Sequence, residues 1–339
     1  MSQAQAGGSV QQIVAELYRG VVAQPFETFK ERALAQLRAA IPFDSAVWGS
    51  GIFSTNAMLS VAMVDFPPAA VMAYANAWQG RDHFRDAAAA QPGKALRPED
   101  LMDREAFERT PMYEAYLKPS GVEHMLGVAQ HNAVTNLGDM IVLFRADRSS
   151  PFSDDERDLF EQLSIHLPNA WQLAQVAQHA RAMADGSVIG LGDTESCAVT
   201  DRQGLLHAAG MDFCLAVRAV SPNWLGPRLP AALDRLHDGE ATTVDLGPYE
   251  FKLCRGPDRN LLWAIPRGRT LSLTPAELRA ARLYAGGMIQ AEIAARLNVS
   301  ASTVRNQLAS AYQKLGVHSK VELVRALNRP APAQDAKPK

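Results

Sequence analysis

Cysteine is scarce in this sequence of 339 residues, and the three present, Cys197, Cys214 and Cys254, lie far apart. None belongs to a CxxC pair, so we expect reduced core thiols rather than a disulfide framework. A run of about 18 apolar residues, which a membrane-spanning helix requires, is missing. The first residues also lack the basic region and apolar core of a secretory signal. These absences predict a cytoplasmic protein without a membrane partner.

Motifs of several enzyme classes are absent as well. The sequence contains no GxxxxGK[ST] phosphate loop, no GxSxG nucleophile elbow and no HExxH zinc motif. An acidic cluster ahead of a strand that ends in aspartate, as in a phosphorylated receiver, is missing too. Glu123, His124 and His131 fall on an expected strand at a spacing that does not suit metal ligation. We therefore expect no catalytic site, no metal and no cofactor.

What the sequence does contain is a C-terminal segment, residues 273–327, with four short helical patterns separated by turn signals. Thr274 and Glu277 form a capping box at the first pattern. The second and third patterns, near 290–297 and 301–315, are joined by so few residues that only a tight turn fits. Two helices on such a turn, the second with exposed polar side chains, make a helix-turn-helix arrangement.

The third pattern has two distinct faces. Apolar residues recur at steps of four, three and four and predict one buried stripe of Val304, Leu308, Ala311 and Leu315. The opposite face carries small or polar side chains, namely Ser302, Thr303, Arg305, Asn306, Ala309, Ser310 and Gln313. Ser319 and Glu322 form another capping box, which predicts a fourth helix through Leu327.

This segment resembles the LuxR-type helix-turn-helix domain over its whole length. The matching strings include Leu273-Thr274-Pro275, Glu292-Ile293-Ala294, Ser302-Thr303-Val304-Arg305 and Lys314-Leu315-Gly316-Val317. The resemblance implies that the third helix enters the major groove of double-stranded DNA and that the fourth pairs two heads of a homodimer. The sequence departs from the family at Gln307 and Ala309, which puts the target sequence in question, and at Ile289, which occupies a usual capping position.

Carried over by position, the resemblance implies that Arg305 and Asn306 reach base edges, because arginine suits guanine and asparagine suits adenine. Phosphate contacts are expected from Thr303, Gln307, Lys314 and Lys320. Ser302, Ala309 and Ser310 complete the expected DNA-binding surface.

Charge is distributed in agreement with this reading. Residues 267–329 hold ten Lys and Arg against three Asp and Glu, a balance of +7, although the whole chain has a formal charge of −2. The residues ahead of this segment are therefore acidic. Such an uneven distribution of charge is typical of a protein that binds DNA at one end. The alternative is that the basic residues only form a solvent-exposed face of a helix.

Ahead of this segment the patterns predict α+β domains built on antiparallel sheets. Residues 9–178 hold a helical stretch over 14–40, then strand pairs near 45–64 and 123–145 that turn near Asn56 and Asn136, with further helical stretches between and after them. Ser153 and Glu156 cap the last helix. Their order resembles a GAF sensor domain. Residues 187–266 resemble a reduced PAS-type module, for which we prefer a spacer or dimerisation role. The helix-turn-helix domain is placed at 270–328, and a disordered tail at 329–339.

One stretch loosely resembles the autoinducer-binding domains of acyl-homoserine-lactone receptors, through Tyr74, Trp78 and Asp82, with His83 where that family has proline. It implies a small-molecule effector among aromatic side chains, with Asp82 or His124 as polar anchor. The alternative makes these aromatics ordinary core and Asp82 a helix cap. The expected lining is Trp48, Phe53, Tyr74, Trp78, Asp82, Phe84, Tyr113, Tyr116, His124 and Met125.

Taken together, the sequence predicts a homodimeric, DNA-binding transcription regulator that is controlled by a small molecule at its N-terminal sensor domain. Two alternatives stay open. One is a ligand-free regulator whose front domains make protein contacts, and the other is an enzyme domain fused to a DNA-binding head.

Overall fold

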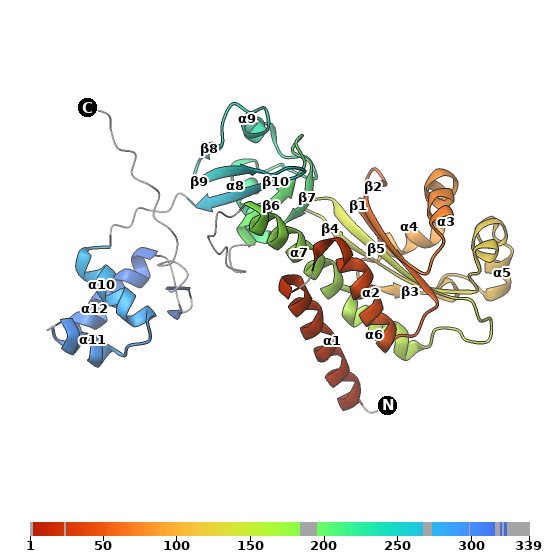
Figure 1. Ribbon diagram of the computed structural model, residues 1–339, viewed down its shortest axis with the longest axis horizontal. Helices are drawn as coiled ribbons and strands as arrows, with labels where there is room; N and C mark the ends of the chain where they lie inside the picture. Colours follow the sequence, from red (N-terminus) through yellow and green to blue (C-terminus); the bar gives the residue numbers. More distant parts are fainter. Residues whose placement is uncertain are drawn as a thin grey trace. The chain divides into compact units, whose positions relative to one another are not determined.

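The computed structural model describes residues 3–23, 25–183, 195–266, 273–297, 299–315, 319–320 and 322–323. The chain divides into two compact units, one of Met1–Leu246 with Glu250–Ile265, the other of Gly247–Tyr249 with Pro266–Lys339. The first unit contains two antiparallel sheets, and the second contains the C-terminal helices (Figure 1). The α+β class expected from the sequence is therefore confirmed. No helix in the described parts combines the length and hydropathy needed to cross a bilayer.

The first sheet has the strand order β2-β1-β5-β4-β3. Both of its hairpins turn through an asparagine with positive φ, Asn56 at 58° and Asn136 at 57°, a backbone region that asparagine tolerates. The two predicted strand pairs are thus confirmed. The strands are β1 Ser45–Ile52, β2 Ala57–Val64, β3 Ala95–Leu96, β4 His124–Asn132 and β5 Leu137–Arg145.

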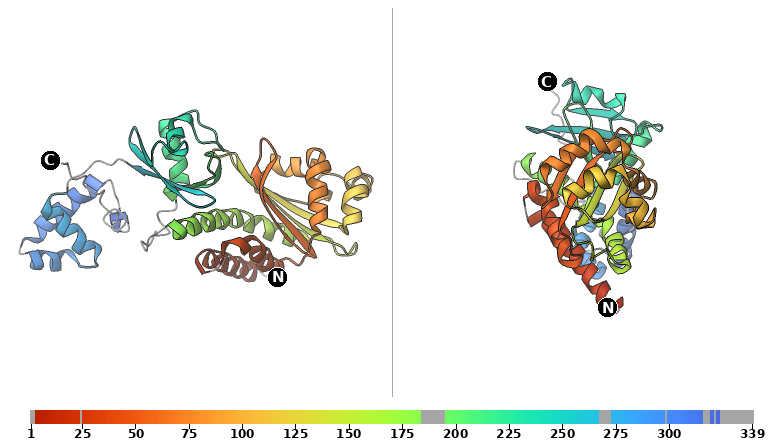
Figure 2. Two further views of the ribbon diagram at one scale, coloured as in Figure 1. Left: turned by 45° about the horizontal axis from the view of Figure 1, so that its top comes forward. Right: turned by 90° about the vertical axis from the view of Figure 1, so that its right-hand side faces the viewer.

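Helices cover both faces of this sheet (Figure 2). One face packs against α1 Gln3–Ala23, α2 Phe29–Ala40, α6 Asp154–Ser164 and α7 His166–Met183. The other packs against α3 Pro68–Ala73, α4 His83–Ala90, α5 Arg104–Glu108 and the short helical turns Tyr74–Trp78 and Tyr113–Leu117. The capping box of Ser153 and Glu156 opens α6 as predicted.

One predicted helix differs in its continuity. A single helical stretch was expected over residues 14–40, but α1 ends at Ala23 and α2 begins at Phe29. Pro25 lies between them, and its missing N–H and fixed φ do not suit a helix interior. The chain therefore turns here, and α1 packs beside both α2 and α7.

The second sheet has the order β7-β6-β10-β9-β8. Numbered from its own first strand, this order is 2-1-5-4-3, the same as in the first sheet. The strands are β6 Cys197–Thr200, β7 Leu206–Ala209, β8 Thr243–Leu246, β9 Tyr249–Arg255 and β10 Asn260–Pro266, with helices α8 Met211–Val220 and α9 Asp234–His237. Cys197 and Cys214 are buried in this part, and Cys254 is half-buried.

Helix α7 contacts both sheets. Its Trp171 stacks on Phe26 with ring centroids 4.6 Å apart, beside the first sheet. Gln172, the next residue, and Gln175, one turn further on, donate hydrogen bonds from their side-chain amides to the backbone carbonyls of Ala209 and His207, on β7. The two sheets of the first unit are thus joined by a continuous helix.

Lys30 of α2 is buried beneath the first sheet, with 3 % of its surface exposed. Its Nζ donates to Ser50 Oγ at 2.5 Å and to Ser60 Oγ at 2.9 Å, and lies 5.2 and 4.7 Å from the ring centroids of Trp48 and Trp171. Burial lowers the pKa of Lys30 to about 8, although nearby carboxylates favour its charged form.

This pKa shift makes the stability of the first unit depend on pH. The folded state disfavours the charged ammonium, so its cost is fully present below pH 8 and disappears as pH rises toward the unfolded value of 10.5. Between pH 7 and pH 10 the unfolding free energy should therefore gain about 2 kcal/mol from this residue. In Lys30→Met, urea unfolding at the two pH values should lack that gain. An equal gain in both proteins would contradict the assignment.

Candidate DNA-binding surface and ligand cavity

The C-terminal unit holds three helices in the described residues, α10 Pro275–Ala285, α11 Gln290–Leu297 and α12 Ala301–Leu315. Thr274 and Glu277 form the predicted capping box at α10. At α12 the Ser300 hydroxyl accepts a hydrogen bond from the Thr303 N–H at 3.1 Å. The two predicted helix starts are confirmed.

The predicted buried stripe of α12 is confirmed at its described positions. Val304, Leu308 and Ala311 are buried together with Ala280 and Ile293 from the two preceding helices. The side chain of Leu315 and most of the predicted fourth helix lie outside the described residues. The Glu322 N–H donates to Ser319 Oγ at 3.2 Å, as the expected cap requires.

Helix α11 begins after Ile289, whose apolar side chain cannot cap the helix. The Glu292 carboxylate, three residues on, accepts a hydrogen bond from the Ile289 N–H at 3.0 Å. Glu292 thus provides the half of a capping box in which a side chain three residues on accepts the backbone N–H at the start of the helix. Ile289 itself is 61 % exposed.

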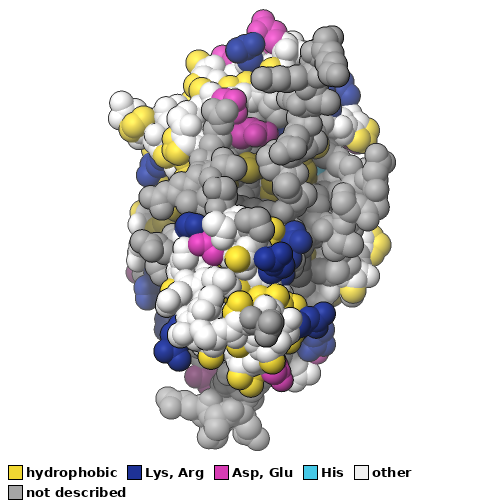
Figure 3. Space-filling view, turned by 90° about the vertical axis from the view of Figure 1, so that its left-hand side faces the viewer, with side chains coloured by type: hydrophobic (Ala, Val, Ile, Leu, Met, Phe, Trp, Pro, Cys, Tyr) yellow, Lys and Arg dark blue, Asp and Glu magenta, His cyan; other side chains and the backbone are white. Residues whose placement is uncertain are grey.

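The face of α12 opposite the core is open to solvent. Ser302, Arg305, Asn306 and Ala309 are exposed. Among the described residues Arg305 has no hydrogen-bond or ion-pair partner, so its guanidinium is free to bind a ligand. In the space-filling view, Lys and Arg side chains stand on the surface among uncharged and acidic ones (Figure 3).

Two residues expected at DNA are instead engaged within the unit. Lys314 Nζ lies 2.7 and 2.8 Å from the two Glu277 carboxylate oxygens, and Ser310 Oγ donates to the same carboxylate at 2.6 Å. These contacts tie α12 to the first turn of α10 and, led by that of Lys314, hold the pKa of Glu277 near 2. The sequence predicted the capping box of Thr274 and Glu277, but it did not predict that Ser310 and Lys314 also bind the Glu277 carboxylate.

The other residues expected to contact DNA differ in their exposure to solvent. Thr303 and Gln307 are half-buried, at the margin of the exposed face. Lys320 is exposed, and its Nζ lies 4.6 Å from the ring centroid of Tyr284 on α10. The open face is thus centred on Ser302, Arg305, Asn306 and Ala309.

The first unit contains a cavity of about 370 Å³ on the face of the first sheet that α3 to α5 cover. This size falls within the range of small-molecule sites. Of the expected lining residues, the structure places six on its wall: Phe53, Tyr74, Asp82, Phe84, Tyr116 and Met125. Most of the remaining wall is apolar.

Trp48 lies on the opposite face of the sheet. Side chains alternate between the faces of a strand, so Val47 and Gly49 reach the cavity whereas Trp48 is buried against α2 and α7. Its indole Nε1 donates to Asp139 at 2.7 Å. Trp78 is also outside the cavity wall and packs on Tyr116 with ring centroids 6.0 Å apart.

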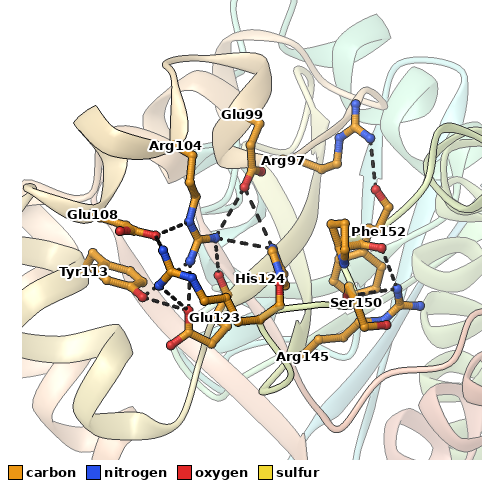
Figure 4. Close-up of polar contacts among 12 residues, drawn as sticks. Arg97, Glu99, Arg104, Glu108, Tyr113, Glu123, His124, Arg145, Ser150 and Phe152 are labelled. Carbon is orange, nitrogen blue, oxygen red and sulfur yellow. Dashed lines mark hydrogen bonds and ion pairs between the residues drawn. The ribbon is translucent and has the colours of Figure 1, made fainter.

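Tyr113 and His124 belong to a polar cluster outside the cavity wall (Figure 4). Arg104 Nη2 and Tyr113 Oη both donate to the Glu123 carboxylate at 2.9 Å. His124 Nδ1 lies 3.3 Å from Arg104, and its Nε2 lies 3.0 Å from the carbonyl of Arg148. Each ionic group has an opposite charge beside it, so this cluster ties α5 to β4.

Asp82 caps a helix, as one of the two alternatives for it expected, and also contacts an aromatic residue of the cavity wall. One carboxylate oxygen accepts the Arg85 N–H at 3.0 Å, which caps α4, and the other accepts the Tyr74 hydroxyl at 2.7 Å. Burial, together with the Asp82 carboxylate, raises the pKa of Tyr74, and burial raises that of Tyr116 to about 12. Both phenols therefore remain neutral hydrogen-bond donors at physiological pH.

Three glycines shape the sheet surface under the cavity. A Cβ at Gly127 would lie 2.6 Å from the Phe84 ring, and one at Gly138 would lie 2.1 Å from the Phe53 ring, so these aromatics rest directly on the strands. A Cβ at Gly49 would meet no atom within 4 Å. Gly49 thus opens onto empty cavity space.

Comparison with known proteins connects the C-terminal unit to a family. The sequence profile of the bacterial regulatory proteins of the luxR family matches residues 271–327. The response regulator RamR of Streptomyces coelicolor is 41 % identical over 107 residues, which cover 28 % of this chain and 53 % of that protein. The chain thus spans about half the length of this relative.

Solved structures offer weaker likenesses. The N-acylhomoserine-lactone-dependent LuxR-family factor CepR2 from Burkholderia cenocepacia is 16 % identical over 48 % of this chain and 92 % of that one, with a TM-score of 0.36. Escherichia coli SdiA is 14 % identical over 93 % and 95 % of the two chains, with a TM-score of 0.35. Scores below 0.5 do not establish a common fold.

The Glu277 contacts predict that Lys314 stabilises the helix-turn-helix unit. In the full chain, Lys314→Ala should accelerate backbone hydrogen exchange in α10 and α12, because the Glu277 carboxylate loses its cation. The matched control is Arg305→Ala, which removes a basic side chain from the same helix without breaking a described contact. Exchange rates that stay unchanged in Lys314→Ala would show that the ion pair does not stabilise this unit.

Because a side chain added at Gly49 would meet only empty space, a large residue there can fill the cavity. Gly49→Phe should fill it from the sheet side and abolish binding of any cavity ligand, while the free energy of unfolding changes little. Gly138→Phe is the control that should destabilise the unit, since its side chain would collide with Phe53. Calorimetric titration and urea unfolding measure the two effects. Retained binding in a folded Gly49→Phe protein would place the ligand elsewhere.

Proposed function

We propose that this chain, whose residues 271–327 form a LuxR-family helix-turn-helix domain, is a transcription regulator controlled by a small molecule in its N-terminal cavity. The observation that carries the proposal is the pairing of an exposed polar face on α12 with a separate, ligand-sized apolar cavity. Neither feature alone requires the other. Together they fit a protein that reads DNA at one unit and a chemical signal at the other.

For DNA, the support comes from the chemistry of the open face of α12. Arg305 and Asn306 are adjacent, exposed and able to make two-pronged hydrogen bonds to purines. Ser302 and Thr303 lie in the N-terminal turn of α12, and the positive end of the helix dipole there favours a phosphate. We assign Arg305 and Asn306 to base edges, and place two such heads on a two-fold site as a homodimer.

For the effector, the support comes from the cavity itself. Its walls combine aromatic and aliphatic side chains with a few polar groups, the usual composition of a site for a small organic molecule. A ligand-free regulator would have no use for such a space, since an empty cavity costs packing energy. The polar cluster of Arg104 and Glu123 has its charges paired, so we assign it a structural role.

A chain of contacts through the first unit provides a route for the signal. Ser50 lines the cavity, and its Oγ accepts a hydrogen bond from Lys30 Nζ. Lys30 in turn lies against the ring of Trp171 on α7. Helix α7 then contacts β7 of the second sheet. We propose that the second sheet, residues 195–266, is a PAS-like relay or dimerisation element. A ligand would act by its different affinity for two arrangements of these parts.

The DNA assignment is tested with Arg305→Ala. Loss of a two-pronged base contact should weaken binding to the preferred sequence by about 1–3 kcal/mol and relax selection at one base pair. Selection from a random DNA pool gives the preferred sequence, and titration against that sequence and a scrambled duplex gives both affinities. An equal loss on the two duplexes would mean that Arg305 contacts the backbone only.

A further inference from the structure

The polar groups of the cavity gather at one end. Apart from Ser50, Asn56, Thr110 and the phenols of Tyr74 and Tyr116, the charged and hydrogen-bonding side chains of its wall all come from residues 79–86, the segment that leads into α4. They are Gln79, Arg81, Asp82, His83, Arg85 and Asp86. The rest of the wall consists mainly of aromatic, aliphatic and methionine side chains. The cavity therefore suits a molecule with an apolar body and one polar head.

At this end the Asp82 carboxylate is already used, and guanidinium donors are left over. Both oxygens of Asp82 accept hydrogen bonds, from Tyr74 and from the Arg85 N–H. Arg85 donates through Nε and Nη2 to Asp86, whose side chain is 57 % exposed. Arg85 Nη1, in contrast, is buried and has no hydrogen-bond partner among the described residues. Arg81, also on the wall, has no ion-pair partner in the described chain either.

A buried guanidinium nitrogen without a partner is costly, and a ligand acceptor would remove the cost. The arginine side chain is itself only 19 % exposed, beside a solvated carboxylate that satisfies two of its donors. A planar guanidinium matches a carboxylate better than it matches a lone carbonyl, because two parallel hydrogen bonds can form. The missing partner is therefore an anionic head group of this shape.

We propose that the cavity binds an apolar monocarboxylate, with its carboxylate on Arg85, supported by Arg81, and its chain among the apolar residues. This inference rests on the proposed effector site and specifies the ligand class. Five of the 11 methionines of the chain line the cavity: Met58, Met102, Met112, Met125 and Met140. Methionine side chains adapt to irregular shapes, so the body of the ligand can be an alkyl or an aryl-alkyl chain.

The test uses two acids, decanoate and 4-phenylbutyrate, each beside its neutral methyl ester, titrated calorimetrically into the full chain. The acids should bind at least tenfold more tightly than their esters, the effect of a charge-assisted hydrogen-bond pair. Arg85→Met should abolish this preference and leave the ester affinities within about threefold. Arg85→Lys, which keeps the charge, should restore part of it.

Each other outcome overturns the inference. If acid and ester bind alike to the unchanged protein, the head group is not recognised. If Arg85→Met weakens acid and ester equally, the residue shapes the cavity rather than holding a charge. If the preference survives in Arg85→Met, another cation provides it. If neither acids nor esters bind, the ligand belongs to a different class.

The same titrations separate this inference from the proposed function. Esters that bind without a preference for the acid, and that are excluded by Gly49→Phe, would keep the effector cavity and remove the carboxylate. Esters and acids that still bind to a folded Gly49→Phe protein would show that the cavity is not the site. In that case the effector part of the proposed function fails together with the inference.

Discussion

The alternation of side chains between the two faces of the first sheet is the constraint on which the rest of the first unit depends. On β1, Trp48 turns toward α2 and α7 and is completely buried, while its neighbours Val47 and Gly49 turn toward the cavity. A register shift of one residue would bring the indole into the cavity and Gly49 into the packed side. One set of hydrogen-bonded strands thus provides a solid core on one face and a hollow site on the other. On the solid side, Lys30 donates to Ser50 and Ser60, and Asp139 accepts a hydrogen bond from Trp48.

In the C-terminal unit, a carboxylate has a comparable organising role. Glu277 closes the start of α10 through Thr274 and also receives Ser310 and Lys314 from α12. Helix α12 is therefore held along the side that faces α10, and its other side remains open. The side chains for which we propose DNA contacts belong to the part of the helix that this anchor leaves free. Lys314, basic and well placed in sequence, is used for the scaffold.

Local features of this fold were predictable because their physical causes are local. The capping pairs of Thr274 and Ser153, the asparagine turns and the stripe of Val304 and Leu308 each depend on residues a few positions apart. The cavity is different, because its wall joins segments that are distant in sequence. An aromatic residue in a strand pattern does not reveal which face it takes or what it meets there. For this reason Phe53 and Tyr116 were placed correctly on the wall, whereas Trp48, Tyr113 and His124 lie elsewhere. Arg85 gave no sequence signal, since its unpartnered nitrogen is a property of the packed state.

Helix α7 has a mechanical consequence. Its 18 residues make a stiff rod of about 27 Å, which touches Lys30 of α2 through Trp171 and the second sheet through Gln172 and Gln175. Trp171, Gln172 and Gln175 lie within about 6 Å of one another along this rod, so a shift in the packing around Trp171 moves the part of the helix that bonds to the second sheet. The stiffness of the helix therefore couples the packing of the two sheets.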